Sequence, residues 1–188
     1  MSLRDTSSGY GLVSRLQHWL MALAIFFLFG LGAWMVTLDY YSPYYKSGPD
    51  LHRSLGIIVA IALAFRFGWR LMNVHPSVEE LSPIERAGAK FLHWGFYPLI
   101  LAVAVSGYLI STSEGRPVDV FGLFSVPSVV VSKGLSDTSG YIHKILAYVT
   151  VGLAVVHAAA AFKHHFVDRN SILKRMWSGS PETKEHTS

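Results

Sequence analysis

The sequence predicts an all-α protein, an integral membrane four-helix bundle with both termini in the cytoplasm. Composition is the first reason: 51% of the 188 residues are hydrophobic and the mean hydropathy is +0.36, which is too apolar for a soluble domain of this length. The second is that four apolar stretches each reach the length of about 20 residues that a helix needs to cross a bilayer. The third is the uneven distribution of Lys and Arg. The four stretches are 15–38, 51–72, 91–112 and 141–166.

The distribution of Lys and Arg predicts the orientation. The two terminal segments and the second connection carry eleven of the 16 Lys and Arg residues, and the other two connections carry five. Because basic residues concentrate in cytoplasmic segments, we expect a multi-pass protein of the bacterial inner (cytoplasmic) membrane. Residues 1–13 would be a cytoplasmic tail, 14–166 the transmembrane domain, and 167–188 a cytoplasmic interfacial segment and tail. The net charge of +4 then reflects topology and contact with anionic membrane lipid, and it does not indicate nucleic-acid binding.

Local signals predict where the helices begin. Ser14 and Gln17 form a capping-box pattern at the first helix, and Asp50 is the expected N-cap of the second. Ser82 and Glu85, with proline at the first helical position, form a capping box for the third.

Three segments outside the spans are also interpretable. The first connection holds four tyrosines, which favour an interfacial aromatic belt over a docking surface. The apolar runs within 113–140 are too short to span, so we expect a lid on the periplasmic surface. Residues 172–177 combine apolar and basic side chains, as in a short interfacial helix on the cytoplasmic leaflet. The tyrosines are Tyr40, Tyr41, Tyr44 and Tyr45.

The last apolar stretch carries two histidines, His143 and His157, fourteen residues apart. At about 100° and ~1.5 Å per residue, the second imidazole returns to within ~40° of the first and lies ~21 Å further along the helix. An ionisable ring inside a bilayer is costly, so it indicates function. His52 should lie at the depth of His143, and His18 at the depth of His157, which gives two layers of two imidazoles.

The two layers favour haem over other metal centres. A single intramembrane histidine equally suits a helix–helix hydrogen bond, but two imidazoles on facing helices at one depth suit a haem iron with two axial ligands. Zinc would require three or four close ligands. The absence of cysteine excludes iron–sulfur clusters and covalent c-type haem. The sequence therefore predicts two haems b, with His52/His143 and His18/His157 as the ligand pairs.

Further polar residues accompany the cytoplasmic layer. Arg15, Arg66 and Arg70 are placed to neutralise haem propionates. His93 is equally consistent with an interfacial polar anchor and with a contact to a haem ligand or a quinone. His164 lies seven residues after His157, and for it we favour a quinone or propionate contact over a ring that extends into the headgroup region.

With these residues identified, the chain resembles the bacterial cytochrome b561 family of di-haem four-helix membrane proteins, over about residues 9–177. The matching segments are Gln17-His18-Trp19-Leu20, Asp50-Leu51-His52-Arg53-Ser54-Leu55-Gly56, Val105-Ser106-Gly107-Tyr108, Val120-Phe121-Gly122-Leu123, His143 with His157, and Lys163-His164-His165-Phe166.

The resemblance implies His18, His52, His143 and His157 as haem ligands. It also implies a range of activities, because the family includes members that oxidise superoxide and pass the electron to ubiquinone, and others that transfer electrons for periplasmic proteins or hydrogenases. The segment 38–52 most resembles the branch often found beside a small periplasmic polyisoprenoid-binding protein.

We therefore expect a di-haem b-type cytochrome that transfers electrons between a periplasmic donor, superoxide being one candidate, and the ubiquinone pool. The alternative is a non-enzymatic cytochrome b anchor or electron-transfer subunit of a larger complex, so the sequence leaves open whether the chain is itself an oxidoreductase. A proton or metal transporter is disfavoured, because no Asp or Glu lies at the centre of a predicted span.

Overall fold

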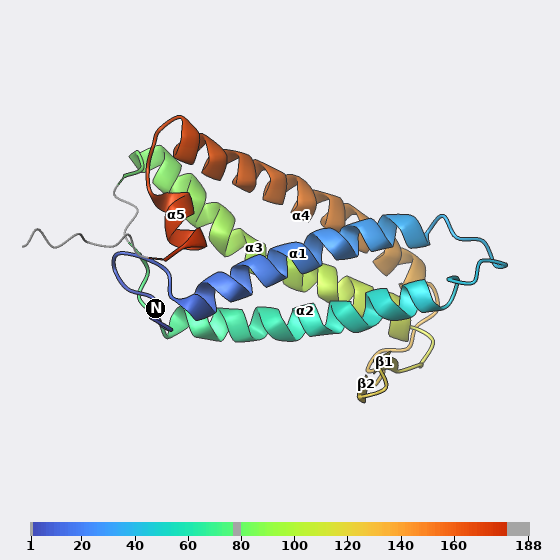
Figure 1. Cartoon of the computed structure of the whole chain (residues 1–188). Helices are drawn as coiled ribbons and strands as arrows, with labels where there is room; N and C mark the ends of the chain where they lie inside the picture. Colours follow the sequence, from blue (N-terminus) through green and yellow to red (C-terminus); the bar gives the residue numbers. More distant parts are fainter. Residues whose placement is uncertain (1, 77–79, 180–188) are drawn as a thin grey trace, which may run out of the picture.

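Four long helices form the body of the protein in the computed structural model, which describes residues 2–76 and 80–179. All four are long and apolar enough to cross a membrane, which confirms the predicted four-helix bundle (Figure 1). A hairpin of two short strands and a terminal helix complete the described chain. The elements are α1 (Leu12–Met35), α2 (Ser47–Leu71), α3 (Pro83–Thr112), β1 (Val118–Val120), β2 (Phe124–Val126), α4 (Leu135–Phe166) and α5 (Ile172–Trp177).

The helices pack in chain order. α1 lies along α2, α2 along α3, and α3 along α4, whereas α1 and α4 approach each other at few points. A small core of Met21, Val59 and Leu63 joins α1 to α2 and packs against Tyr97 and Ile100 of α3. Large apolar side chains elsewhere on the helices point outward, as expected of a bundle that meets lipid.

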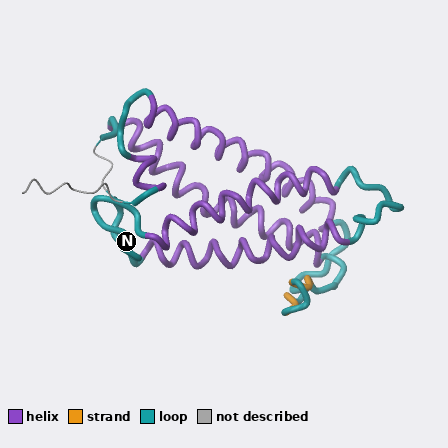
Figure 2. Tube along the Cα trace, viewed as in Figure 1, coloured by secondary structure: helices purple, strands orange, loops and turns teal. Residues whose placement is uncertain are grey.

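The two ends of the bundle differ. Both described chain ends lie at one end, where Arg15 beside Tyr10 lies against Gly179, and we call this the terminal end. The hairpin and the long loop between α1 and α2 lie at the other end, the hairpin end (Figure 2). Residues 180–188, part of the predicted C-terminal tail, lie outside the described residues.

The predicted helix starts were partly wrong. α1 begins at Leu12 after Gly11, and the Ser14 hydroxyl instead donates to the Asp5 carboxylate at 2.8 Å. α2 begins at Ser47, so Asp50 lies in its first turn and does not cap it. In both cases residues that we expected in the preceding loop form the first turn of the helix, so the helix begins before the predicted cap. The Ser82 capping box of α3 is confirmed.

The hairpin was not predicted from the sequence. β1 and β2 pair antiparallel, with Val118 opposite Val126, and the turn places Phe121 and Gly122 at positive φ. Ser54 of α2 holds this turn, because its hydroxyl donates to the Asp119 carbonyl at 3.2 Å and accepts the Phe121 N–H at 3.4 Å. The apolar segment expected as a surface lid is therefore anchored to one end of α2.

The short helix expected at residues 172–177 is present as α5, and it folds back onto the start of α1 (Figure 1). Arg15 donates to the Trp177 carbonyl at 2.6 Å, and the Trp19 indole donates to the Met176 carbonyl at 3.1 Å. Glu80 accepts hydrogen bonds from Ser171 at 2.9 Å and also pairs with the Arg175 guanidinium. α5 is thus tied to α1 and, through Glu80, to the turn before α3.

Candidate functional site

Two histidine pairs cross the bundle, one near each end. At the hairpin end, His52 of α2 faces His143 of α4 with ring centroids 6.1 Å apart and planes at 77°. At the terminal end, His18 of α1 faces His157 of α4 with centroids 6.3 Å apart and planes at 71°. The structure therefore brings together the same four side chains that the sequence pairs by depth.

The spacing within each pair fits a single bridging metal atom. A metal–imidazole nitrogen bond is about 2 Å long, and the nitrogen lies about 1.1 Å from the ring centre, so two imidazoles on opposite sides of one metal have centroids about 6 Å apart. Both pairs match this distance. Only two imidazoles meet at the hairpin end in the described chain, which suits the axial positions of haem iron better than a tetrahedral zinc site.

The orientation of His143 leaves one nitrogen available as a ligand. Its Nδ1 lies 2.9 Å from the Val103 carbonyl and 3.3 Å from the Ser106 hydroxyl oxygen. Since a carbonyl only accepts, Nδ1 carries the proton and donates, and Nε2 retains the lone pair that a metal requires. We did not predict this contact from the sequence. The one feature that could have indicated it is the small, polar pair Ser106-Gly107 within an apolar stretch.

Two of the three predicted arginines lie near the terminal-end pair. The Arg66 charge lies close enough to His18 to act on it electrostatically, and the guanidinium donates to the Ser14 carbonyl at 3.5 Å. Arg70 lies over the Trp94 ring at 5.5 Å and is also close to His93. Arg15 instead donates to α5, so it contributes to the fold at this end.

Tyr10 joins the same cationic cluster from the N-terminal loop. Burial raises the pKa of its phenol above the usual value, and the nearby Arg70 and Arg66 charges partly offset this effect. Its hydroxyl therefore stays protonated at neutral pH and can donate a hydrogen bond.

His93 lies inside the bundle, next to the terminal-end pair. Its ring centroid is 5.1 Å from that of His157, closer than the centroid of His18, and Phe96 packs against the same imidazole at 6.1 Å. His93 therefore contacts one of the proposed haem ligands.

His164 lies in the last turn of α4 and has a partner just after the helix. Its Nδ1 lies 2.7 Å from the Asp168 carboxylate, which also pairs with Lys163 at 2.8 Å. Lys163 in turn bonds Glu85 at 2.9 Å. The hydrogen bonds from Lys163 and His164 lower the pKa of Asp168. The contact to a propionate or quinone that we predicted for His164 would have to be made by its other ring nitrogen.

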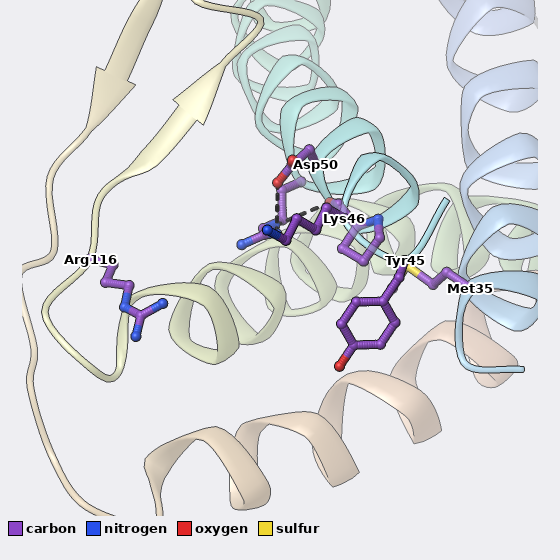
Figure 3. A pocket seen from close by; sticks show the side chains of 7 residues that line it. Met35, Tyr45, Lys46, Asp50 and Arg116 are labelled. Atoms are coloured by element: carbon purple, nitrogen blue, oxygen red, sulfur yellow. Dashed lines mark hydrogen bonds and ion pairs between the residues drawn. The ribbon is translucent and has the colours of Figure 1, made fainter. Parts of the chain in front are cut away.

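A cationic pocket of about 460 Å³ opens at the hairpin end (Figure 3). Arg53, the residue after His52, lies in its wall and pairs with Asp50 at 2.8 Å. Lys46 and Arg116 add two further positive charges, and Met35, Tyr45 and Pro49 complete the lining. Of these three cations, Arg53 is paired with Asp50 and Arg116 with Glu114 at 3.4 Å, so within the described chain Lys46 adds the charge that no carboxylate balances in the pocket.

Comparison with known proteins agrees with this geometry. The sequence profile of the family described as "Prokaryotic cytochrome b561" matches residues 9–179. The chain is 42% identical to "Cytochrome b561 homolog 2" of Escherichia coli (strain K12), over 94% of this chain and 95% of that protein. It is 29% identical to "Probable superoxide oxidase CybB" of Yersinia pestis, over 85% and 90% of the two chains.

These matches extend over all four spanning helices and both histidine pairs. With the apolar outer surface of the bundle, they identify a multi-pass protein of the bacterial inner membrane that carries b-type haem and transfers electrons. The chain belongs to the prokaryotic cytochrome b561 family.

Proposed function

We propose that the protein holds two haems b and transfers electrons across the inner membrane to ubiquinone. His52 and His143 would hold one haem, and His18 and His157 the other. The observation that carries the proposal is the near-equal spacing of the two pairs, 6.1 and 6.3 Å between centroids. In the proposed orientation both termini are cytoplasmic, so the hairpin end faces the periplasm.

A haem b held by two imidazoles supplies one-electron transfer between ferric and ferrous iron. The chain provides the neutral imidazoles, the apolar helices that keep water away, and the positive charges for the propionates. Arg66 and Arg70 are the proposed propionate partners at the terminal end, with Arg15 holding α5 beside them.

Superoxide is the electron donor that the cationic pocket supports best. Lys46, Arg53 and Arg116 line the pocket at the proposed periplasmic face, where Asp50 and Glu114 balance two of the three charges. The remaining positive charge would raise the encounter rate with a small anion. Similarity to a protein named as a probable superoxide oxidase supports the same donor. In the net reaction two superoxide ions and two protons reduce one ubiquinone, giving two molecules of dioxygen and one ubiquinol.

The terminal end is the proposed site of quinone reduction. His93 could donate a hydrogen bond to a quinone carbonyl beside His157, with Phe96 as an apolar wall. His164, held by Asp168, is the proposed second hydrogen-bond partner on the cytoplasmic side, where protons for ubiquinol are available.

A second candidate function is electron transfer for a periplasmic partner, in which the protein serves as a membrane anchor. In this alternative Tyr40, Tyr41 and Tyr44, which are 76%, 91% and 56% exposed at the hairpin end, would form a docking surface instead of the aromatic belt that the sequence favours, because exposed tyrosines are common at protein interfaces. A polyisoprenoid-binding protein of the periplasm is the partner class that the sequence resemblance suggests.

One experiment separates the two functions. The purified protein is first assayed for two haems b per chain by a reduced-minus-oxidised spectrum with haem quantification. It is then mixed with superoxide in a stopped-flow instrument, with ubiquinone present and no partner. Rapid reduction supports superoxide oxidation; reduction by quinol but not by superoxide, even at low salt, would favour the partner-dependent carrier.

A further inference from the structure

We infer that Gly107 is a positioning residue: its missing side chain lets His143 lie against α3, donate Nδ1–H to the Val103 carbonyl, and so lower the midpoint potential of the haem at the hairpin end. The inference rests on the proposed haem function. It concerns how closely His143 and His52 are held at the hairpin-end haem, and the difference in midpoint potential between the two haems.

Gly107 leaves space that His143 fills. A Cβ atom at position 107 would lie 3.0 Å from Cε1 and 3.2 Å from Nδ1 of His143, closer than ordinary van der Waals contact allows. Any larger residue would push the imidazole away from α3. Gly95, on the same helix, has no described atom within 4 Å of such a Cβ.

The space allows a specific pair of hydrogen-bond acceptors to reach Nδ1. The Val103 carbonyl lies 2.9 Å from Nδ1 of His143, and the Ser106 hydroxyl oxygen lies 3.3 Å away. The Ser106 hydroxyl donates its own hydrogen to the carbonyls of Ala102 at 2.7 Å and Val103 at 2.9 Å, so its lone pairs face His143. Nδ1 therefore meets two acceptors, which fixes the tautomer.

The facing ligand is held in a similar way but less closely. A glycine also lies against His52, since a Cβ at Gly32 would be 3.2 Å from its Cε1. The Leu28 backbone, four residues before Gly32, is a hydrogen-bond partner of this ring, as Val103 is of His143. However, Nδ1 of His52 makes no hydrogen bond of normal geometry to the described residues, and it has no second acceptor comparable to Ser106. His143 is thus the more strongly held of the two.

The hydrogen bond has an electronic consequence. An imidazole that donates Nδ1–H to a carbonyl becomes a more basic ligand, and a more basic axial ligand stabilises ferric over ferrous iron. Within the described chain, no glycine lies against His18 or His157. The contact would thus lower the potential of the hairpin-end haem, which favours electron flow from the hairpin end to the terminal end.

The test compares Gly107→Ala with Gly95→Ala by potentiometric titration of the haem-loaded protein. Both changes raise the helix propensity of α3, so a difference between them arises from His143. We expect Gly95→Ala to titrate as the unaltered protein. In Gly107→Ala the potential of the hairpin-end haem should rise, with a change in its low-spin electron paramagnetic resonance signal and an unshifted terminal-end haem.

A second variant covers the case in which Gly107→Ala fails to bind the hairpin-end haem. Ser106→Ala leaves the space intact and removes one acceptor, so it should retain both haems and raise the same potential by a smaller amount. Unshifted titrations in both variants, or an equal shift in Gly95→Ala, would overturn the inference. Failure of the proposed function would look different, because the unaltered protein would then lack two haems.

Discussion

At the scale of the residue, the two imidazoles of α4 have different surroundings. His143 donates to a backbone carbonyl of α3, whereas His157 packs against the rings of His93 and Phe96. The two pairs are therefore similar in spacing but have different neighbours. Because they lie at opposite ends of the bundle, removal of one ligand should affect one haem only.

The first prediction concerns this pairing. His52→Ala should remove the hairpin-end haem and leave the terminal-end haem spectrally intact, whereas His157→Ala should do the reverse, because each iron would lose one of its two strong ligands. Haem content per chain and difference spectra measure both outcomes. If the two variants lose the same haem, the pairing is wrong.

Arg66 provides the second prediction. Arg66→Leu removes a positive charge beside His18 and should change the midpoint potential of the terminal-end haem by an amount on the order of tens of millivolts, the scale of one partly screened charge at this range. The sign depends on whether the released propionate takes up a proton. Arg66→Lys keeps the charge and serves as the matched variant.

A redox titration of both haems decides this prediction. The hairpin-end haem should be unshifted in either variant, since the arginine lies at the other end of the bundle. Titrations of Arg66→Leu that match the unaltered protein for both haems would remove Arg66 from the site.

At the scale of the element, two small structures are attached to the helices by few polar contacts. The hairpin depends on Ser54, and α5 depends on Arg15, Trp19 and Glu80. Because each attachment consists of only a few contacts, a single substitution should weaken it.

The third prediction concerns the hairpin. Ser54→Ala leaves the Asp119 carbonyl and the Phe121 N–H without their side-chain partner, and the buried position of Ser54 suggests a loss of about 1–3 kcal/mol in the free energy of unfolding. Denaturant titration in detergent measures it. Ser125→Ala, which removes an exposed 3.5 Å contact, should cost much less; equal losses would contradict the assigned role.

The attachment of α5 should depend on pH. Hydrogen bonds from the Ser171 backbone, its hydroxyl and Arg175 lower the pKa of Glu80 below its ordinary value of 4.5. A carboxyl with a depressed pKa contributes stability above the unfolded value and loses it as the pH falls through the folded value. We therefore expect α5 to loosen below about pH 4.5 and to be fully attached at neutral pH.

Tryptophan fluorescence measures this fourth prediction, because Trp177 packs on Trp19 at 5.3 Å. Glu80→Gln should weaken the attachment at neutral pH and flatten its acid transition, whereas the exposed Glu114→Gln should leave the transition in place. An acid transition that Glu80→Gln does not alter would assign it to another carboxyl group.

At the scale of the whole molecule, charge is concentrated at the two ends and the spans are apolar. The pocket at the hairpin end carries three cations and one carboxylate, and the terminal end holds Arg66 and Arg70 near the second histidine pair. An anionic donor would therefore be attracted to the end opposite the proposed quinone site.

The fifth prediction follows from this field. The rate at which superoxide reduces the purified protein should fall as ionic strength rises, because the Debye length is about 8 Å at physiological salt. Arg116→Gln should lower the rate at low salt, and Lys90→Gln at the other end should not. A rate independent of both salt and Arg116 would exclude electrostatic steering by this pocket.

The sequence was sufficient for the features that depend on helical periodicity and hydropathy. The four spans and the depths of His18, His52, His143 and His157 follow from regular rise and rotation along each helix. The sequence was insufficient for features that depend on contacts between residues far apart in the chain. The hairpin on Ser54 and the contact of Gly107 with His143 depend on how one element is rotated against another.

α4 contributes one histidine to each pair, and this has a consequence for how the protein can change in evolution. Inserting one residue between His143 and His157 would rotate one imidazole by about 100° away from its partner. Loops such as 36–46 can gain or lose residues at little cost, but the fourteen-residue interval in α4 cannot. Natural variants should therefore differ in length in the connections and keep this interval constant.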